Sequence, residues 1–443
     1  MKHLARIGKV DKIIPIDGAD FVQSAVVYGF NVIVSKNVQV GDLGVFFEAT
    51  DIQLSDEYAK MNNLYRHSEY NSDVNAKGYL EDNRKLKVQK FLKTKSEGLF
   101  MSLDSLSYTG YDISVFKFGD SFDELNEHQI CNKFYNAKTA GARNSNTSRK
   151  KNSTPLFHEH LDTEQLSYYI DSIPKGSLVT ITSKNHGTSG RYSFTPVAKE
   201  VVETVVDKIY VPSLKRNIKK TRQIKKSVTD YEYVVGTRRV VLGSDGENKT
   251  GFHGSEKYRY DILQTLKPYL EKNMTIYLEI VGYVNGAPVM GTHDVTKLKD
   301  DAFVQKYGKK VVYKYGCMQD EFNICVYRIS YTNPDGVEMD LSHSQMVDWC
   351  NKRNIPVVKT LVDTFVYDGN KDALFQQAVF LAENEKNLCE DYNDPSHICE
   401  GVVVRVDNYG LRPDLYKYKS FPFRVMEGIA KLKSDFIDVE DAS

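Results

Sequence analysis

The stretch from Ser177 to Ser193, SLVTITSKNHGTSGRYS, joins an apolar segment to a turn that contains glycines. Its first half is apolar and alternating up to Ser183, a pattern that predicts a buried β-strand. Lys184 stands where the strand gives way to the turn, and Gly187 follows three residues later. Because glycine allows close approach of the backbone to a ligand, we expect the turn to hold Lys184 beside a bound group.

A lysine at such a place can act as a nucleophile if it loses its proton. Its pKa is ordinarily about 10.4, and burial or a neighbouring cation lowers it. A single lysine before a glycine turn is more often a solvated loop residue. The chemical interpretation of Lys184 therefore depends on other segments.

Two acids and two further lysines supply this support. Glu279 lies within YLEIVGY (277–283) and Glu400 opens EGVVVRVD (400–407), so each is a carboxylate on an apolar strand, where an isolated charge is costly. Two such acids can hold Mg²⁺ or Mn²⁺, directly or through water. Alternation in YKYKSF places Lys417 and Lys419 on one face of a strand, an arrangement suited to a polyphosphate.

The remaining pattern predicts an α+β chain with an N-terminal OB-like β-barrel and a second domain of antiparallel sheets and helices. Short strands separated by turns occupy residues 3 to about 50. Helical spacing appears at 260–273 and 373–388, while LVTITSK, TIYLEIVGY, FNICVYRIS and EGVVVRVD are typical of strands. We expect a barrel at 1–120, a polar basic linker at 121–156, a catalytic domain at 157–430 and an acidic tail at 431–443.

Composition narrows the class of protein. The 443 residues include 59 basic and 59 acidic side chains, so the overall charge does not favour a nucleic-acid partner, and only its distribution can. The six cysteines form no CxxC pair or zinc-type spacing, as in proteins of a reducing compartment. No apolar run is long enough for a signal peptide or membrane span. We expect a monomer in the cytoplasm of a cell or virus-infected host.

In combination, these segments resemble the covalent nucleotidyltransferases, which comprise polynucleotide ligases and mRNA capping enzymes. The resemblance rests on Lys184-Asn185-His186-Gly187, Glu279-Ile280-Val281-Gly282, Glu400 to Arg405 and Lys417-Tyr418-Lys419, which match motifs I, III, IV and V. Motif I has a histidine at its third position and is followed directly by Thr188, and in this it is similar to the motif of one branch of the RNA ligases. The N-terminal stretch resembles the OB module of RNA ligases of the Deinococcus and Naegleria type, and no second OB module is expected after motif V, unlike in most DNA ligases and capping enzymes.

The resemblance implies an ATP-dependent RNA ligase that joins 3′-hydroxyl and 5′-phosphate ends through a lysyl-AMP and an RNA-adenylate, and it leaves open whether the RNA is a nicked duplex, a broken tRNA loop or a single strand. It implies that Lys184 is catalytic, that Glu279 and Glu400 serve the ribose and Mg²⁺ or Mn²⁺, and that Lys417 and Lys419 steady the phosphates. The implied nucleotide site also contains Ser183, His186 and Gly187. The alternatives are a DNA ligase, a GTP-dependent capping guanylyltransferase, or a catalytically inactive nucleic-acid-binding protein.

Two positions depart from the family pattern and leave alternatives open. Motif IIIa commonly ends in an acid, whereas FNICVYRIS has Arg328 after Tyr327, and either Phe322 or Tyr327 could stack on adenine. The arginine of motif Ia could be Arg238, about fifty residues after Lys184, or Arg191, which is closer in sequence.

Two other patterns are open to a simple structural interpretation. The stretch LKRNIKKTRQIKKS (214–227) has seven basic residues and no acid, and we expect it to form a loop that contacts RNA phosphates or a solvated face. His158 and His160 have metal-ligand spacing but no third ligand nearby, so a turn before a helix is the favoured interpretation.

Overall fold

The N-terminal module is an OB-fold barrel. In the computed structural model, which describes residues 4–49, 51–135, 154–211, 216–243, 250–251, 253–298, 300–384, 397–408 and 410–430, its strands follow the order β3-β2-β1-β4-β8, and β9 also pairs with β1. The strands are β1 (Ala5–Ile14), β2 (Val22–Val27), β3 (Phe30–Ser35), β4 (Leu43–Glu48), β8 (Gly98–Ser102) and β9 (Ser121–Phe122). Strands β3 and β8 lie side by side, and the Glu97 amide donates to the Asn31 carbonyl at 2.8 Å. The barrel is thus nearly closed, as the sequence predicts.

This module continues beyond the expected boundary at residue 120. Strand β12 (Cys131–Lys133) pairs with β5 (Ile52–Leu54), and β10 (Glu124–Leu125) pairs with β11 (His128–Gln129). The other elements of this region are α1 (Asp56–Met61), β6 (Gln89–Phe91) and β7 (Thr94–Ser96). Residues 136–153 of the expected linker and the expected tail at 431–443 lie outside the described part of the chain.

The described residues of the second domain form two large sheets, whose strands are mainly antiparallel. The five-stranded sheet has the order β13-β28-β27-β14-β26, in which only the β13–β28 pair is parallel: β13 (Glu164–Gln165), β14 (Leu178–Lys184), β26 (Thr360–Val366), β27 (Gly401–Asp407) and β28 (Asp414–Lys419). The seven-stranded sheet has the order β17-β16-β15-β20-β24-β25, with β21 beside β20: β15 (Thr188–Val211), β16 (Arg216–Gly236), β17 (Val241–Leu242), β20 (Met274–Val284), β21 (Ala287–Pro288), β24 (Phe322–Thr332) and β25 (Glu338–Asp340).

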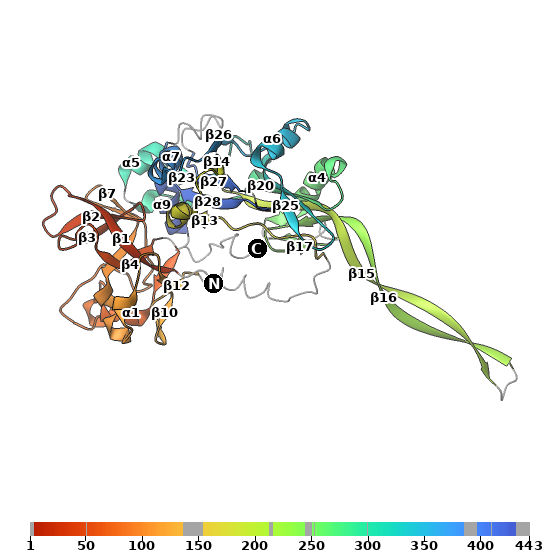
Figure 1. Cartoon of the computed structure of the whole chain (residues 1–443), viewed down its shortest axis with the longest axis horizontal. Helices are drawn as coiled ribbons and strands as arrows, with labels where there is room; N and C mark the ends of the chain where they lie inside the picture. Colours follow the sequence, from red (N-terminus) through yellow and green to blue (C-terminus); the bar gives the residue numbers. More distant parts are fainter. Residues whose placement is uncertain are drawn as a thin grey trace.

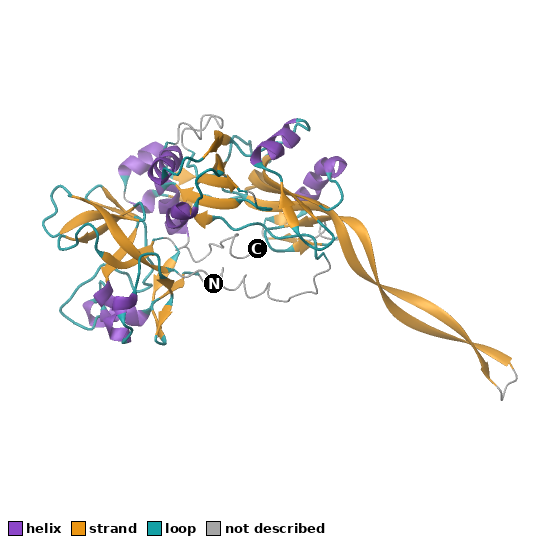
Figure 2. Cartoon of the chain, in the orientation of Figure 1, coloured by secondary structure: helices purple, strands orange, loops and turns teal. Residues whose placement is uncertain are grey.

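Helices lie at the periphery of these sheets (Figure 2). They are α3 (Leu166–Tyr169), α4 (Lys257–Leu266), α5 (Asp301–Tyr307), α6 (His343–Asn351), α7 (Lys371–Glu383) and α9 (Phe421–Ala430). Two short antiparallel pairs accompany them: β18 (Thr250–Gly251) with β19 (Gly254–Ser255), and β22 (His293–Asp294) with β23 (Lys310–Val311). The expected helix at 260–273 ends early, at Leu266, and a 3-10 turn at Lys267–Tyr269 follows, because Pro268 has no amide hydrogen to continue the helical hydrogen bonds.

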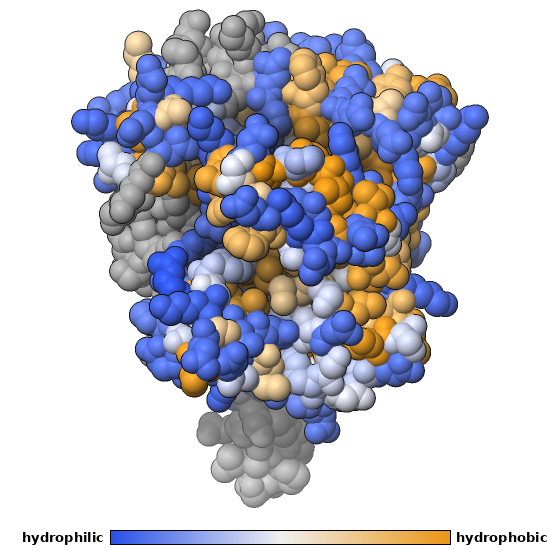
Figure 3. Space-filling model, turned by 90° about the vertical axis from the view of Figure 1, so that its left-hand side faces the viewer, coloured by the Kyte–Doolittle hydropathy of each residue, from blue (hydrophilic) through white to orange (hydrophobic). Residues whose placement is uncertain are grey.

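The barrel packs against the end of the second domain that carries α3 and α9 (Figure 1). The Arg6 guanidinium lies 4.3 Å from the centre of the Tyr168 ring, and the Tyr168 hydroxyl donates to Glu48 at 2.8 Å. Arg424 of α9 forms a buried ion pair with Glu97. The barrel end of the molecule is mainly hydrophilic on its surface, with apolar residues gathered in clusters (Figure 3).

The largest departure from the sequence-based expectation is a long two-stranded ribbon. Strands β15 and β16 pair continuously from Arg191↔Gly236 to Val211↔Arg216 and project far from the body of the molecule (Figure 1). The prediction of a loop at 214–227 was wrong for residues 216–227, which belong to strand β16. The segment VVETVVDKIYV (201–211) is rich in β-branched residues, which favour an extended backbone.

Candidate active site

Lys184 is the last residue of β14, an interior strand of the five-stranded sheet. Strand β14 is flanked by β27 and β26, so its residues from Val179 to Ser183 are buried while Lys184 is partly exposed. The Lys184 amine lies 2.7 Å from Oε1 of Glu400, and the two side chains are 16% and 1% exposed. The end of β14 thus places the Lys184 amine against the buried Glu400 carboxylate.

A second lysine reaches the same carboxylate. The Lys419 Nζ lies 3.8 Å from Oε1 of Glu400 and 3.0 Å from Oε1 of Glu427 on α9. Gly401, which follows Glu400, has φ +149° and faces the Tyr418 carbonyl so closely that a Cβ would lie 2.1 Å from that oxygen. Glycine at this position lets β27 approach β28, and it brings residues of motifs I, IV and V into one cluster.

The turn after Lys184 is fixed by its neighbours. The His186 amide donates to the Tyr315 hydroxyl at 2.5 Å, and the His186 ring lies edge-on to Tyr313 and Phe423, with ring centres 4.7 Å apart in each case. A Cβ on Gly187 would lie 2.2 Å from the carbonyl oxygen of Ile280. Only glycine fits between this turn and β20.

An open pocket lies next to Lys184 between the two sheets. Glu279 on β20 lines it, and the Ser189 hydroxyl on β15 donates to Glu279 at 3.4 Å. Val358, Val403 and Leu415 provide apolar walls. The polar lining includes Thr182, Ser183, Lys184, Asn185, Ser189 and Arg238. A mixed pocket of this kind suits a ligand with a flat apolar part and a charged part.

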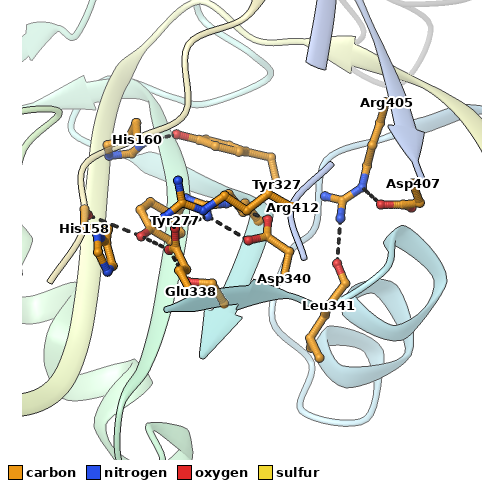
Figure 4. Close-up of polar contacts among 12 residues, drawn as sticks. His158, His160, Tyr277, Tyr327, Glu338, Asp340, Leu341, Arg405, Asp407 and Arg412 are labelled. Atoms are coloured by element: carbon orange, nitrogen blue, oxygen red, sulfur yellow. Dashed lines mark hydrogen bonds and ion pairs between the residues drawn. The ribbon is translucent and has the colours of Figure 1, made fainter. Parts of the chain in front are cut away.

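Of the two candidate aromatic residues, Tyr327 lines the pocket and Phe322 does not. Phe322 lies at the start of β24 opposite Gly282, 6.3 Å from the Tyr258 ring. The Tyr327 hydroxyl contacts Nδ1 of His160 (Figure 4). Burial raises the pKa of Tyr327, and burial together with nearby arginines holds the pKa of His160 well below its usual value. The tyrosine therefore donates and the neutral imidazole accepts.

The two candidate arginines occupy different environments. Arg238 lines the pocket and is hydrogen-bonded to Asp162 at 2.8 Å. Arg191 is 1% exposed and donates to the carbonyls of Phe157, His158 and Thr237 at 3.1, 2.6 and 2.9 Å. Arg191 thus binds backbone, whereas Arg238 faces the pocket.

Lys417 extends the cationic face of β28 toward the barrel. With Lys419 it lines a second pocket, at the junction of the two domains, to which Arg6 and Glu48 of the barrel and Arg424 also contribute. The alternation predicted for Lys417 and Lys419 is present, and Lys419 connects this pocket to Glu400.

A buried ionic network supports β24 behind the pocket (Figure 4). Arg328 is paired with Glu338 at 2.7 Å and with Asp340 at 2.6 Å. Glu338 also accepts from the Tyr277 hydroxyl at 2.8 Å and contacts Arg412 at 3.0 Å. The arginine that departs from the motif IIIa pattern thus belongs to the structural frame of the sheet.

Sequence reasoning missed several pocket residues. His160 was interpreted as part of a turn, and Ser189, Cys325, His343 and Arg405 were not singled out, although all of them line the pocket. Cys325 and Tyr327 are two residues apart on one strand, so the alternation of side chains could have indicated that both lie on the same face. The others are brought in by tertiary packing, for which the sequence contains no local signal.

Comparison with known proteins agrees with this geometry. The profile of the RNA ligase family matches residues 177–419, more than half of the chain, and an OB-fold domain profile matches residues 4–102. A search of curated proteins gives no match. In the described part of the chain, no helix is both long and apolar enough to cross a bilayer.

Solved structures share the fold over nearly the whole chain. A mutant of the Naegleria gruberi RNA ligase with ATP and Mn is 15% identical, with a TM-score of 0.56 over 95% of this chain and 98% of that one. The same ligase with PPi is 17% identical, with a TM-score of 0.56 over 95% and 97%. A mutant with AMP and Mn is 16% identical, with a TM-score of 0.56 over 96% and 98%.

Proposed function

Since the chain belongs to the RNA ligase family, we propose that it is an ATP-dependent RNA ligase that joins 3′-hydroxyl and 5′-phosphate ends through a covalent adenylate on Lys184. One observation carries the proposal: the Lys184 amine lies 2.7 Å from the buried Glu400 carboxylate, at the edge of a pocket that also contains Glu279 and Tyr327.

The chemistry consists of three in-line displacements at phosphorus. In the first, the deprotonated Lys184 Nζ attacks the α-phosphorus of ATP, forming a P–N bond as the bond to pyrophosphate breaks. In the second, a 5′-phosphate oxygen of RNA attacks the same phosphorus and releases the lysine. In the third, the 3′-hydroxyl attacks the 5′-phosphorus, loses its proton and expels AMP. Positioning and fixed cations supply most of the acceleration in such reactions.

The site residues have separable roles in these steps. Glu400 orients the Lys184 amine and is placed to take its proton. Lys419, 3.8 Å from the same carboxylate oxygen, and Lys417 would neutralise the phosphates and the departing pyrophosphate. His186 and Gly187 fix the turn that holds the nucleophile, and Ser183 lines the pocket beside it.

The pocket also fits a nucleotide and a divalent cation. Tyr327 supplies a ring for adenine, with Arg238 on the same lining, and Glu279 is placed for the ribose or the ion. Mg²⁺ and Mn²⁺ bind through one or two carboxylates plus phosphate and water oxygens, which Glu279 and Glu400 could provide. Such an ion would neutralise charge on the phosphates. The solved relatives with ATP and Mn support ATP and Mg²⁺ or Mn²⁺ as partners.

We test the proposal by incubating the protein with Mg²⁺ and α-labelled ATP or GTP, followed by a denaturing gel. Wild type should keep the ATP label, Lys184→Ala should lose it, and Lys175→Ala, which alters an exposed lysine before the same strand, should keep it. Addition of 5′-phosphorylated RNA should transfer the label to the RNA. A label from GTP alone would instead indicate a guanylyltransferase, and no label from either nucleotide would overturn the enzymatic proposal.

A further inference from the structure

Among the residues that the structure describes, the β15–β16 ribbon pairs with no third strand over most of its length. Strand β15 pairs with β20 only from Thr188↔Ile280 to Ser193↔Thr275. From Pro196↔Tyr231 to Val211↔Arg216 it pairs with β16 alone. At about 3.3 Å per residue, this two-stranded part is roughly 50 Å long. Figure 1 shows it as an arm that leaves the body of the molecule.

Charge is distributed unequally between the two strands of the arm. On β16, the sequence from 216 to 229 contains six basic residues and no acid: Arg216, Lys219, Lys220, Arg222, Lys225 and Lys226. The facing sequence of β15, from 199 to 211, contains three acids and two lysines. The β16 edge is therefore rich in cations, in a protein whose formal charges balance overall.

Cross-strand ion pairs do not cancel this charge. Arg222 is paired with Asp207 at 2.8 Å and Lys225 with Glu200 at 3.7 Å, but the two basic side chains are 59% and 76% exposed. Exposed pairs of this kind contribute about 0–1 kcal/mol. The cations are thus available to a stronger anionic partner.

The chemistry of the edge favours an anionic polymer over a second copy of the chain. A symmetric contact between two arms would place the same edge on both sides, so that β16 cations would face β16 cations. Like charges directly opposite each other on neighbouring strands are destabilising. A phosphate backbone, by contrast, presents regularly spaced negative charge along a line.

The arm also begins in the active site. Ser189 of β15 lines the pocket beside Lys184 and pairs with Glu279 of β20. The strand that starts at the nucleotide pocket is therefore the one that continues into the arm. An RNA whose end lies at Lys184 would have its adjoining backbone within reach of β16.

We propose that the β15–β16 ribbon is an RNA-binding arm whose basic β16 edge holds the phosphate backbone of the RNA to be sealed. This proposal rests on the proposed ligase function. The contact would be independent of sequence, because phosphates position a nucleic acid without reading its bases. It would increase affinity for RNA without taking part in formation of the lysyl-AMP.

The test compares two charge variants of the same ribbon. The first carries Lys219→Gln, Arg222→Gln, Lys225→Gln and Lys226→Gln, and the matched control carries Glu200→Gln, Glu203→Gln and Asp207→Asn on the opposite strand. Fluorescence anisotropy with a labelled, 5′-phosphorylated RNA hairpin, in the absence of ATP, gives the affinity at each KCl concentration. Gel labelling with ATP alone gives lysyl-AMP formation for each variant.

The loss of four phosphate contacts should make the negative slope of log K against log [KCl] less steep by roughly 3. Between about 50 and about 200 mM KCl, the variant should then lose about 50- to 100-fold less affinity than wild type does. The basic-edge variant should show this change and still form lysyl-AMP, and the acidic-edge control should keep its slope. A variant in which an Asn-Gly turn replaces residues 199–228, joining the adjacent pair Ala198↔Thr229, should also bind RNA weakly.

Unchanged affinity and slope in the basic-edge variant would overturn the proposal. A second result would also overturn it: light scattering shows that wild type is a dimer, removal of the arm makes it monomeric, and RNA binding does not change. The arm would then be a contact between two copies of the chain. Failure of wild type to form lysyl-AMP would count against the ligase function alone, because RNA binding is measured separately.

Discussion

Arg328 offers a sharp test of how the candidate site is held in place. Its side chain is 1% exposed, and it lies between the Glu338 and Asp340 carboxylates, whose side chains are 1% and 2% exposed. The guanidinium is also 4.4 Å from the centre of the Tyr277 ring. One cation therefore compensates two buried anions directly behind the pocket.

Replacing Arg328 by methionine removes the cation and keeps most of the packing volume. Removing one partner of a buried ion pair costs about 3–5 kcal/mol, because the opposite charge stays buried, so we expect Arg328→Met to reduce the free energy of unfolding by about that amount at pH 7. Burial favours the protonated Glu338 carboxyl, but the Arg328 charge holds its pKa below the ordinary value.

The penalty should depend on pH with a definite sign. In wild type, the lowered pKa of Glu338 makes a stabilising contribution that is present above the unfolded pKa and is lost as the pH falls. In Arg328→Met, burial dominates and raises the pKa of the same group, so the folded variant binds the proton more readily than the unfolded chain. The difference in stability between the two proteins should therefore begin to shrink above the ordinary pKa of 4.5, as the folded variant takes up its proton, and should shrink further below that value, as wild type loses its contribution.

Urea unfolding, followed by tyrosine and tryptophan fluorescence, measures both effects. The matched control is Arg412→Met, because Arg412 contacts the same Glu338 at 3.0 Å but is 44% exposed, and its loss should cost less than about 1 kcal/mol. Adding Glu338→Gln and Asp340→Asn to Arg328→Met should recover much of the loss. Equal costs for Arg328→Met and Arg412→Met would refute the reasoning.

Two further predictions concern the pocket. Tyr327→Ala should weaken ATP binding by about 5- to 150-fold, the equivalent of about 1–3 kcal/mol of base stacking, whereas Phe322→Ala should leave the KM for ATP nearly unchanged; the opposite ranking would assign the adenine contact to Phe322. Burial, with the nearby Arg405 charge, lowers the pKa of His343 from 6.5 to about 4, so below about pH 6.5 the unfolded chain binds a proton that the folded chain does not. The free energy of unfolding should fall by up to about 3 kcal/mol as the pH drops to about 4. His343→Gln should flatten this part of the plot of unfolding free energy, measured with urea, against pH. Parallel plots for wild type and variant would exclude His343 as the cause.

The parts of the fold that were predictable are those in which a local pattern coincides with burial. Strand β14 has the bounds of its apolar run, and Leu178–Lys184 is the segment that the sequence indicates. Strands β20 and β27 lie within one residue of their predicted runs at each end. Glu279 was recognisable as an acid within the apolar β20, and Glu400 directly precedes β27. The proximity of Lys184, Glu400 and Lys419 follows from the order of motifs, not from any one of them.

What the sequence left open depends on tertiary contacts. Arg191 and Arg238 look equivalent as isolated arginines, and only the structure shows Arg191 donating to three backbone carbonyls while Arg238 faces the pocket. His160 is similar, since its partner Tyr327 is 167 residues away. The ribbon was missed for another reason: its basic residues suggest a solvated loop, and a two-stranded ribbon without a third layer is rare because it is marginally stable alone.

Strand β24 has one irregularity, and it lies at the candidate aromatic residue Tyr327. Opposite β20, the register passes from Tyr277↔Arg328 to Leu278↔Val326, so Tyr327 is an extra residue in a β-bulge. Bulges re-aim side chains and recur next to active sites. Here Tyr327 lines the pocket. Arg328 lies opposite Tyr277 and over its ring, on the same face of the sheet, and its charge is compensated by Glu338 and Asp340. The arginine at this position, where the family pattern has an acid, is therefore compatible with the nucleotide pocket, because its two acidic partners hold it in the buried network while the neighbouring Tyr327 lines the pocket.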